Sequence, residues 1–289
     1  MDSSKAALRK MVDERRGLVV PGAFNAMSAR VVAENGFRAV YVTGAGVTNM
    51  YMGIPDLSFI GLHEICEHTA RIRDAVEIPV IVDADTGFGN PVNTYRTVQM
   101  LERAGADAIQ FEDQIFPKKC GHFSGKEVID IKDMEAKIKA AADARKDQDL
   151  MIIGRTDSAA VQGFDAAIER AQRMAEAGAD ILFVEAVESE AEIRKLPQLL
   201  DRPLLINIVI GGKTPTLDAD VFGAMGFSIV LYANAALQGA VAGMNKALGV
   251  LRERGRIDED PAIVASFAER QRLVNKDFYD ELERRYTVE

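Results

Sequence analysis

Cysteine is scarce in this sequence, and the two cysteines form no recognisable metal-binding or disulfide pattern. Cys66 and Cys120 are far apart, and neither belongs to a CxxC pair. Such usage predicts a protein of the reducing cytoplasm. The sequence also lacks any apolar run of about 18 residues, the length that spans a membrane. The charged N-terminal stretch, residues 1–17, has no apolar region of the kind found in signal peptides, so we expect none.

Positive charge is in deficit. The sequence has 35 Lys and Arg against 44 Asp and Glu, which gives a formal net charge of −9 and a pI near 5.1. This balance argues against nucleic acid or an anionic membrane as a partner, and we expect neither. It does not exclude an anionic substrate, because local cations or a bound metal ion can reverse the field at one site.

The sequence does contain a series of short apolar runs, separated by segments with helical periodicity. Its 289 residues suit one large α/β barrel or two medium domains, and a hydrophobic content of 48% supports a sizeable core. The runs are almost continuously apolar, as in strands that are buried on both faces of a parallel sheet. They lie at residues 18–24, 39–44, 79–85, 108–113, 150–157, 181–186, 203–209 and 227–234.

Eight such strands with helical connections predict a (β/α)₈ barrel of the TIM type, with a doubly wound parallel sheet as the alternative. A weak internal repeat favours the barrel. LERAGADAIQFED at 101–113 matches MAEAGADILFVEA at 174–186, with looser copies at 32–44 and 221–233. Each copy has a glycine where a helix would end in a left-handed residue before the next strand. These glycines are Gly36, Gly105, Gly178 and Gly226.

The C-terminal part of the chain extends beyond the eighth predicted strand. We expect the barrel to occupy residues 1–245 and additional helices to occupy 246–289. The apolar residues of this tail need a surface that buries them. That surface is either the chain's own barrel or a neighbouring subunit, and the residues alone do not decide between the two. The positions concerned are Ile263, Val264, Phe267, Leu273, Val274 and Phe278.

Polar side chains stand at the ends of most of the predicted strands. The functional groups of a parallel barrel gather at the carboxyl ends of its strands, and charges there are costly to bury unless they are paired or bind a metal ion. We therefore interpret these residues as a functional site rather than as solvated strand ends. They are Tyr41, Thr43, Asp83, Asp85, Glu112, Asp113, Arg155, Asp157, Glu185 and Asn207.

Several of these groups are carboxylates, which favours a divalent metal ion. Asp83, Asp85, Glu112 and Glu185 offer only oxygen ligands, the kind that suits Mg²⁺ or Mn²⁺. Such an ion could collect the oxygens of a small keto acid and stabilise an enolate. Arg155 is the natural partner for a substrate carboxylate, because its planar guanidinium binds two oxygens at once.

The loop that follows the fourth predicted strand reads PKKCGHFSGKEV, residues 117–128. Cys120 stands there beside two lysines and His122. Cationic neighbours lower the pKa of a thiol, so this cysteine is a candidate acid/base. An unreactive cysteine in an ordinary loop is the alternative.

These stretches resemble the isocitrate lyase and phosphoenolpyruvate mutase superfamily. The likeness extends from about residue 17 to 235. The KKCGH motif is similar to that of the lyase branch, which includes 2-methylisocitrate lyase, 2,3-dimethylmalate lyase and the petal death protein. The stretches that carry the likeness are YVTGAG, the loop with Asp56, VDADTGFGNP, FEDQIFPKKCGH, GRTD, VEA and IN.

The resemblance implies a metal site and an adjoining substrate site. The residues around Mg²⁺, some of them through water, would be Asp56, Asp83, Asp85 and Glu112. The residues around the keto-acid carboxylate would be Tyr41, Thr43 and Gly44. Arg155 would bind and orient the substrate, with Glu185 and Asn207 nearby.

The resemblance also implies a role for the cysteine loop and an assembly. Cys120 would protonate the departing carbanion, with Gly121 and His122 shaping the loop. The C-terminal helices would be exchanged between subunits, within a homotetramer. This favours the neighbouring subunit as the surface that covers the tail.

One position departs from the family pattern. The similar lyases have a glutamate shortly after the asparagine of the seventh strand, whereas this sequence has Ile210 in INIVIGGKTP. An alkyl group in place of an acidic contact disfavours a tricarboxylate substrate. A smaller or more apolar 2-hydroxy diacid fits better.

Together these observations predict a Mg²⁺-dependent carbon–carbon lyase. Its substrate would be a 2-hydroxy di- or tricarboxylic acid of the 2,3-dimethylmalate or 2-methylisocitrate type, cleaved to pyruvate or a related α-keto acid and a carboxylate. The first alternative is an oxaloacetate hydrolase or decarboxylase of the same superfamily. A phosphonate mutase and a non-catalytic barrel that binds keto acids are further alternatives, and a shared fold alone does not separate them.

Overall fold

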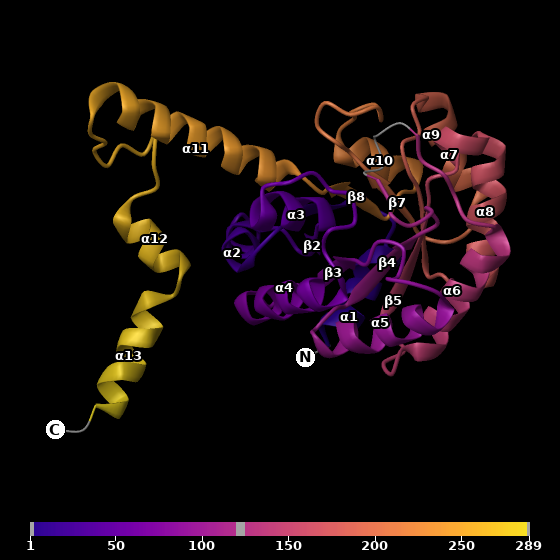
Figure 1. Cartoon of the computed structure of the whole chain (residues 1–289), viewed down its shortest axis with the longest axis horizontal. Helices are drawn as coiled ribbons and strands as arrows, with labels where there is room; N and C mark the ends of the chain where they lie inside the picture. The colour runs from indigo at the N-terminus through magenta and orange to yellow at the C-terminus, as the bar shows by residue number, and fades with distance from the viewer. Residues whose placement is uncertain (1–2, 120–124, 288–289) are drawn as a thin grey trace. The chain divides into compact units, whose positions relative to one another are not determined.

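The chain folds around a closed barrel of eight parallel strands in the computed structural model, which describes residues 3–119 and 125–287. Consecutive strands are hydrogen-bonded neighbours, and the last pairs with the first (Figure 1). This confirms the predicted (β/α)₈ barrel and excludes the doubly wound sheet. The strands are β1 (Leu18–Ala23), β2 (Val40–Val42), β3 (Val80–Asp83), β4 (Ala108–Glu112), β5 (Met151–Thr156), β6 (Ile181–Val184), β7 (Leu204–Asn207) and β8 (Ile229–Tyr232).

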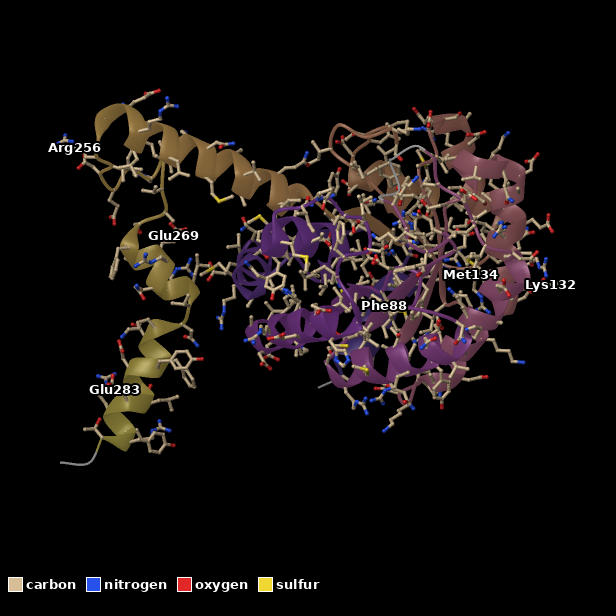
Figure 2. The ribbon with its side chains drawn as sticks, in the orientation of Figure 1. Phe88, Lys132, Met134, Arg256, Glu269 and Glu283 are labelled. Atoms are coloured by element: carbon tan, nitrogen blue, oxygen red, sulfur yellow. The ribbon has the colours of Figure 1, made fainter. Side chains whose placement is uncertain are left out.

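Ten helices accompany the strands in the described part of residues 1–234, and α4, α5, α6 and α8 lie outside the strands in Figure 1. Figure 2 shows the two sides of α6: Met134, which is fully buried, faces the strands, and the exposed Lys132 points away from them. The helices are α1 (Ser4–Asp13), α2 (Ala26–Glu34), α3 (Gly44–Met52), α4 (Leu62–Ala75), α5 (Pro91–Arg103), α6 (Ile131–Ala144), α7 (Ala159–Gln162), α8 (Phe164–Glu176), α9 (Glu190–Leu199) and α10 (Ala219–Met225).

The interior of the barrel is a packed core. Ile81, Ile153, Phe183 and Leu231 are at most 2% exposed and belong to one cluster of contacting side chains. Helix α1 adds Leu8 to the same cluster. Because apolar side chains fill the barrel, only the loops at the ends of the strands can hold a polar site.

The four repeat glycines end their helices as the sequence predicts. Their φ angles are 80° at Gly36, 96° at Gly105, 114° at Gly178 and 104° at Gly226, in the left-handed region that favours glycine. The aspartate two residues after Gly105 is Asp107, whose carboxylate accepts a hydrogen bond from the backbone N–H of Val80 at 2.7 Å. The repeat therefore encodes the junction between a helix and the following strand.

Residues 236–289 form a second compact unit, described here through residue 287. Its helices are α11 (Ala235–Arg254), α12 (Phe267–Leu273) and α13 (Lys276–Tyr286). The boundary predicted at residue 245 falls inside α11. Figure 2 labels three charged side chains of this unit, Arg256, Glu269 and Glu283.

Several large apolar side chains in the described part of the second unit are exposed. Helices α12 and α13 bury none of their residues fully. Phe267 is 63% exposed, Phe278 49% and Tyr286 71%. Packing of this unit on a neighbouring subunit stays a prediction. No helix in the described ranges has the length and apolarity that a membrane crossing requires.

Candidate active site

The predicted strand-end residues gather at one mouth of the barrel. Pairing of adjacent strands places Glu112 beside Arg155, and Asp83 beside Gln110. A cavity at this mouth is lined by seven of the predicted site residues. They are Tyr41, Thr43, Asp56, Asp83, Arg155, Glu185 and Asn207.

Three further predicted residues, Gly44, Asp85 and Glu112, contact residues that line the cavity. The backbone N–H of Gly44 donates to Asp83 at 3.4 Å, and Glu112 contacts Arg155 at 3.3 Å. The backbone N–H of Asp85 donates to Asp83 at 3.2 Å. Asp113 and Asp157 are fully buried and do not line the cavity, and the backbone N–H of Asp157 donates to Asp113 at 2.9 Å. The other predicted residues, Cys120, Gly121 and His122, lie outside the described residues.

Arg155 is a buried cation surrounded by carboxylates. Its Nε and Nη2 donate to the two oxygens of Asp157 at 2.8 and 3.1 Å. Its Nη1 lies 3.3 Å from Glu112, and its Nη2 lies 3.6 Å from Glu185. The guanidinium carbon sits 5.1 Å from the ring centroid of Phe183. These contacts fix the guanidinium at the wall of the cavity, where a ligand carboxylate could reach it.

Burial opposes ionisation of the acidic residues here. It raises the pKa of Asp85 to about 7, although the nearby Lys118 acts in the opposite direction. It also raises the pKa of Glu112 well above its usual range, against the effect of Arg155. Carboxylates crowded in a low-dielectric site favour protonation or a bound cation.

Lys118 brings a cation among these carboxylates. Its Nζ lies 2.6 Å from Asp56 and 2.9 Å from Asp85, and its side chain is only 4% exposed. Its backbone N–H donates to Ser58 at 2.9 Å. Lys118 thus joins the segment after β4 to the segment after α3.

Thr43 follows β2 and caps the N-terminus of α3. Its hydroxyl accepts a hydrogen bond from the backbone N–H of Gly46 at 3.2 Å and donates one to Asn234 at 3.4 Å. Thr43 and Ala45 line the cavity, so the first turn of α3 reaches it, while the backbone N–H groups of Gly44 and Gly46 donate to Asp83 and Thr43. Burial, followed by the charge of Asp83, raises the pKa of the neighbouring Tyr41 well above its usual value. Tyr41 thus stays a neutral hydroxyl.

The donor set fits a hard divalent ion that is bound partly through water. Two of the buried oxygens that have no hydrogen-bond partner among the described residues are Oε1 of Glu112 and Oδ1 of Asn207. Among the described residues, no three Asp, Glu, His or Cys side chains are grouped closely enough to hold an ion by direct contact. Mg²⁺ commonly keeps several waters and takes only one or two carboxylates, so a site of this kind would not require such a group.

Several site residues were not singled out by the sequence. Phe183 lies in the middle of an apolar strand, and Lys118 is one of two adjacent lysines that the sequence does not distinguish. The strand-end pattern could have pointed to Asn234, which follows β8 and lines the cavity. Val209 also lines it, whereas the neighbouring Ile210 is 49% exposed.

Comparison with known proteins gives the family. The family model described as phosphoenolpyruvate phosphomutase matches residues 8–251. The chain belongs to the phosphoenolpyruvate mutase and isocitrate lyase superfamily. Within it, the chain is 42% identical over 242 residues to 2,3-dimethylmalate lyase of Eubacterium barkeri, covering 84% of each chain. It is 44% identical over 248 residues to 2-methylisocitrate lyase of Aeropyrum pernix, covering 86% of this chain and 80% of the relative.

Solved structures of the superfamily share this fold along nearly the whole chain. A 2,3-dimethylmalate lyase superposes with a TM-score of 0.92 at 33% identity, covering 99% of this chain and 96% of the other. Oxaloacetate acetylhydrolase with 3,3-difluorooxalacetate gives 0.89 at 33% identity, with coverages of 97% and 95%. Phosphonopyruvate hydrolase with oxalate and Mg²⁺ gives 0.88 at 31%, with coverages of 99% and 99%. The resemblance found in the sequence and the prediction of an enzyme of the lyase class are confirmed.

Proposed function

We propose that this enzyme is a Mg²⁺-dependent carbon–carbon lyase. It cleaves a substituted malate-type 2-hydroxy acid to an α-keto acid and a carboxylate. The observation that carries the proposal is the position of Arg155, a buried guanidinium held by carboxylates at the wall of the cavity. A fixed guanidinium of this kind recognises a carboxylate and stabilises charge that develops on it.

The apolar part of the cavity lining supports an alkyl-substituted substrate. Ala45, Val209, Leu231 and Ala233 line the cavity together with the charged groups. Small apolar contacts of this kind accommodate methyl groups and offer nothing to a third carboxylate. A dimethylmalate-like diacid therefore suits the cavity better than a methylisocitrate-like triacid.

The metal site would be formed by Asp83, Asp85, Glu112 and Asp56, some of them through water. Mg²⁺, or Mn²⁺ in its place, would supply positive charge to the oxygens of the keto acid and to the enolate that forms. The buried Oε1 of Glu112 and the crowding of the carboxylates support this assignment.

The reaction would begin when a base of the cavity removes the proton of the 2-hydroxyl group. The C2–O bond then becomes a carbonyl, and the C2–C3 bond breaks with its electron pair remaining on C3. Arg155 holds the enolate-like charge of the fragment, while Thr43, Gly44 and Tyr41 hold the keto-acid carboxylate. Glu185 and Asn207 orient the substrate beside Arg155.

The C3 carbanion would take its proton from the thiol of Cys120, with Gly121 and His122 shaping the loop around it. The proton removed from the hydroxyl group then replaces the one that the thiol gave up. This role comes from the likeness of the KKCGH stretch to the lyase branch.

Likeness to oxaloacetate acetylhydrolase supports a second candidate, hydrolysis or decarboxylation of oxaloacetate with the same metal ion and Arg155. A phosphonate mutase fits less well, because its loop differs from KKCGH. A non-catalytic keto-acid-binding barrel would not need the full set of acid/base residues.

We also propose a cytoplasmic homotetramer in which the second unit packs on a neighbouring subunit. The exposed Phe267, Phe278 and Tyr286 support this, because large apolar side chains gathered on two short helices favour burial in an interface. Sedimentation of the purified protein tests the assembly.

A Mg²⁺-dependent turnover screen tests the function. Lactate dehydrogenase coupling reports pyruvate from 2,3-dimethylmalate, 2-methylisocitrate and citramalate, and from decarboxylation of oxaloacetate. Chromatography reports glyoxylate from isocitrate and oxalate from hydrolysis of oxaloacetate. We expect turnover of an alkyl-malate that is lost with EDTA and falls by about 10²- to 10⁴-fold in Cys120→Ser. Turnover of oxaloacetate alone, unchanged in Cys120→Ser, would move the enzyme to the hydrolase or decarboxylase branch.

A further inference from the structure

Two buried cations share one carboxylate at the back of the site. The Nζ of Lys126 donates to Oδ1 of Asp157 at 2.7 Å. The same oxygen accepts from Nη2 of Arg155 at 3.1 Å, while Oδ2 accepts from Nε of Arg155 at 2.8 Å. The side chain of Asp157 is fully buried, and that of Lys126 is 2% exposed. Solvent therefore screens this contact little, unlike an ion pair at the surface.

Carboxylates outnumber cations around Arg155. Glu112 lies 3.3 Å from its Nη1, and Glu185 lies 3.6 Å from its Nη2, in addition to Asp157. A substrate carboxylate would have to compete with these three acidic side chains for the guanidinium. A residue that forms an ion pair with one of these three side chains weakens the interaction of that side chain with Arg155. The guanidinium is then more available to bind the substrate carboxylate.

Lys126 forms such an ion pair with Asp157. Burial acts to raise the pKa of Asp157, but Arg155 and Lys126 together bring it below its usual value. Asp157 thus stays ionised and divides its charge between two partners. Without Lys126, Arg155 would be the one cation among the described residues that pairs with this buried carboxylate. Asp157 would then hold the guanidinium more tightly against the back of the site.

We propose that Lys126 is a positioning residue, which keeps Arg155 available for a substrate carboxylate by sharing Asp157 with it. Lys126 itself does not stand among the residues that line the cavity, so it acts through Arg155. This inference rests on the proposed function, in which Arg155 binds the substrate.

The test is a double-mutant cycle read by oxalate binding. Calorimetry with Mg²⁺ present compares the wild-type protein, Lys126→Met, Arg155→Met and the double variant. We expect Lys126→Met to weaken oxalate binding by about tenfold in the wild-type background and by less than about twofold in the Arg155→Met background. Lys126→Arg, which keeps the charge, should recover most of the affinity, and it replaces Lys126→Met if that variant does not fold.

Lys137 offers a matched control. As whole residues, Lys126 and Lys137 are both 8% exposed, but the Nζ of Lys137 donates to the backbone carbonyl of Thr86 at 2.9 Å. Lys137→Met removes a buried ammonium group that has no bond to Asp157. We expect its oxalate affinity to stay within about twofold of the wild type.

The outcomes separate the two proposals. Wild-type binding with unchanged affinity in Lys126→Met would overturn the role of Lys126 alone. The same is true if the full tenfold effect persists in the Arg155→Met background, because the lysine would then act on structure and not through Arg155. A wild-type protein that binds no oxalate with Mg²⁺ would overturn the proposed function and, with it, this role.

Discussion

The ammonium nitrogen of Lys118 lies between two buried carboxylates, 2.6 Å from Asp56 and 2.9 Å from Asp85. One side chain therefore connects the segment after α3, the segment after β3 and the segment after β4. Ion pairs at a surface contribute little to stability, but removal of one partner of a buried pair leaves an uncompensated charge.

Replacement of Lys118 by Met should destabilise the metal-free protein by about 3 kcal/mol or more. Urea unfolding with and without Mg²⁺ measures this, and a bound divalent ion should restore part of the loss because it supplies the missing positive charge. Lys132→Met is the control, since Lys132 is exposed on α6, and it should change stability by no more than about 0.5 kcal/mol. Equal unfolding of the two variants would refute the structural importance of Lys118.

Replacement of Arg155 by Lys should lower kcat/KM by about 10²- to 10³-fold. Lysine keeps the charge, but it cannot bond both oxygens of Asp157 and still present a planar edge to the substrate. Steady-state kinetics measures the loss, and circular dichroism checks that the barrel is intact. A folded variant with kinetics close to those of the wild type would show that charge alone suffices at this position.

The raised pKa of Asp85 predicts how the metal-free protein responds to pH. Its pKa is about 7 in the folded protein and 3.8 ordinarily, so the folded state favours the protonated form. This contribution to stability is fully present below about pH 4 and is lost as the pH rises through about 7.

Metal affinity should change in the opposite direction. Ionised Asp85 is the form that attracts Mg²⁺, so affinity should rise with pH and level off above about 7. Mg²⁺ titrations followed by thermal unfolding at several pH values measure both trends. Asp85→Asn is the control variant, and it should flatten them. An equally steep pH response in Asp85→Asn would assign the titration to another group.

Replacement of Ile210 by Glu should shift selectivity from alkyl-malates toward 2-methylisocitrate, because it would restore the acidic group that the sequence resemblance leads us to expect at this position. The ratio of kcat/KM for 2,3-dimethylmalate to that for 2-methylisocitrate measures the effect. Ile210 is 49% exposed, so stability should change by no more than about 0.5 kcal/mol. An unchanged ratio would leave selectivity to Val209 and the other residues of the cavity wall.

The sequence predicted the fold well, because each strand carries its own signal. A short apolar run between helical segments identified all eight strands, and the polar residues at the ends of the runs identified the charged and polar core of the cavity wall. The repeated aspartates proved to serve the opposite end of the barrel from the site. Asp180 accepts a hydrogen bond from the backbone N–H of Ile152 at 2.9 Å, as Asp107 does from Val80.

The buried ion pairs could not be predicted from the sequence, because they depend on tertiary contacts. Lys126 is 31 positions from Asp157, and Lys118 is 62 positions from Asp56, so no local spacing marks them. A lysine in a polar loop is ordinarily solvated, and only the folded barrel shows that these two are buried.

The pairing of β1 with β8 sets a condition on synthesis of the chain. Leu18 stands opposite Ile229, and a side chain at Gly22 would collide with the backbone of Ala233. Strand β1 is made before the other seven strands of the barrel. The edge of β1 that pairs with β8 therefore stays unpaired until more than two hundred further residues have been made. An exposed strand edge invites pairing with other chains, so this long wait is when the nascent protein is most exposed to misassembly.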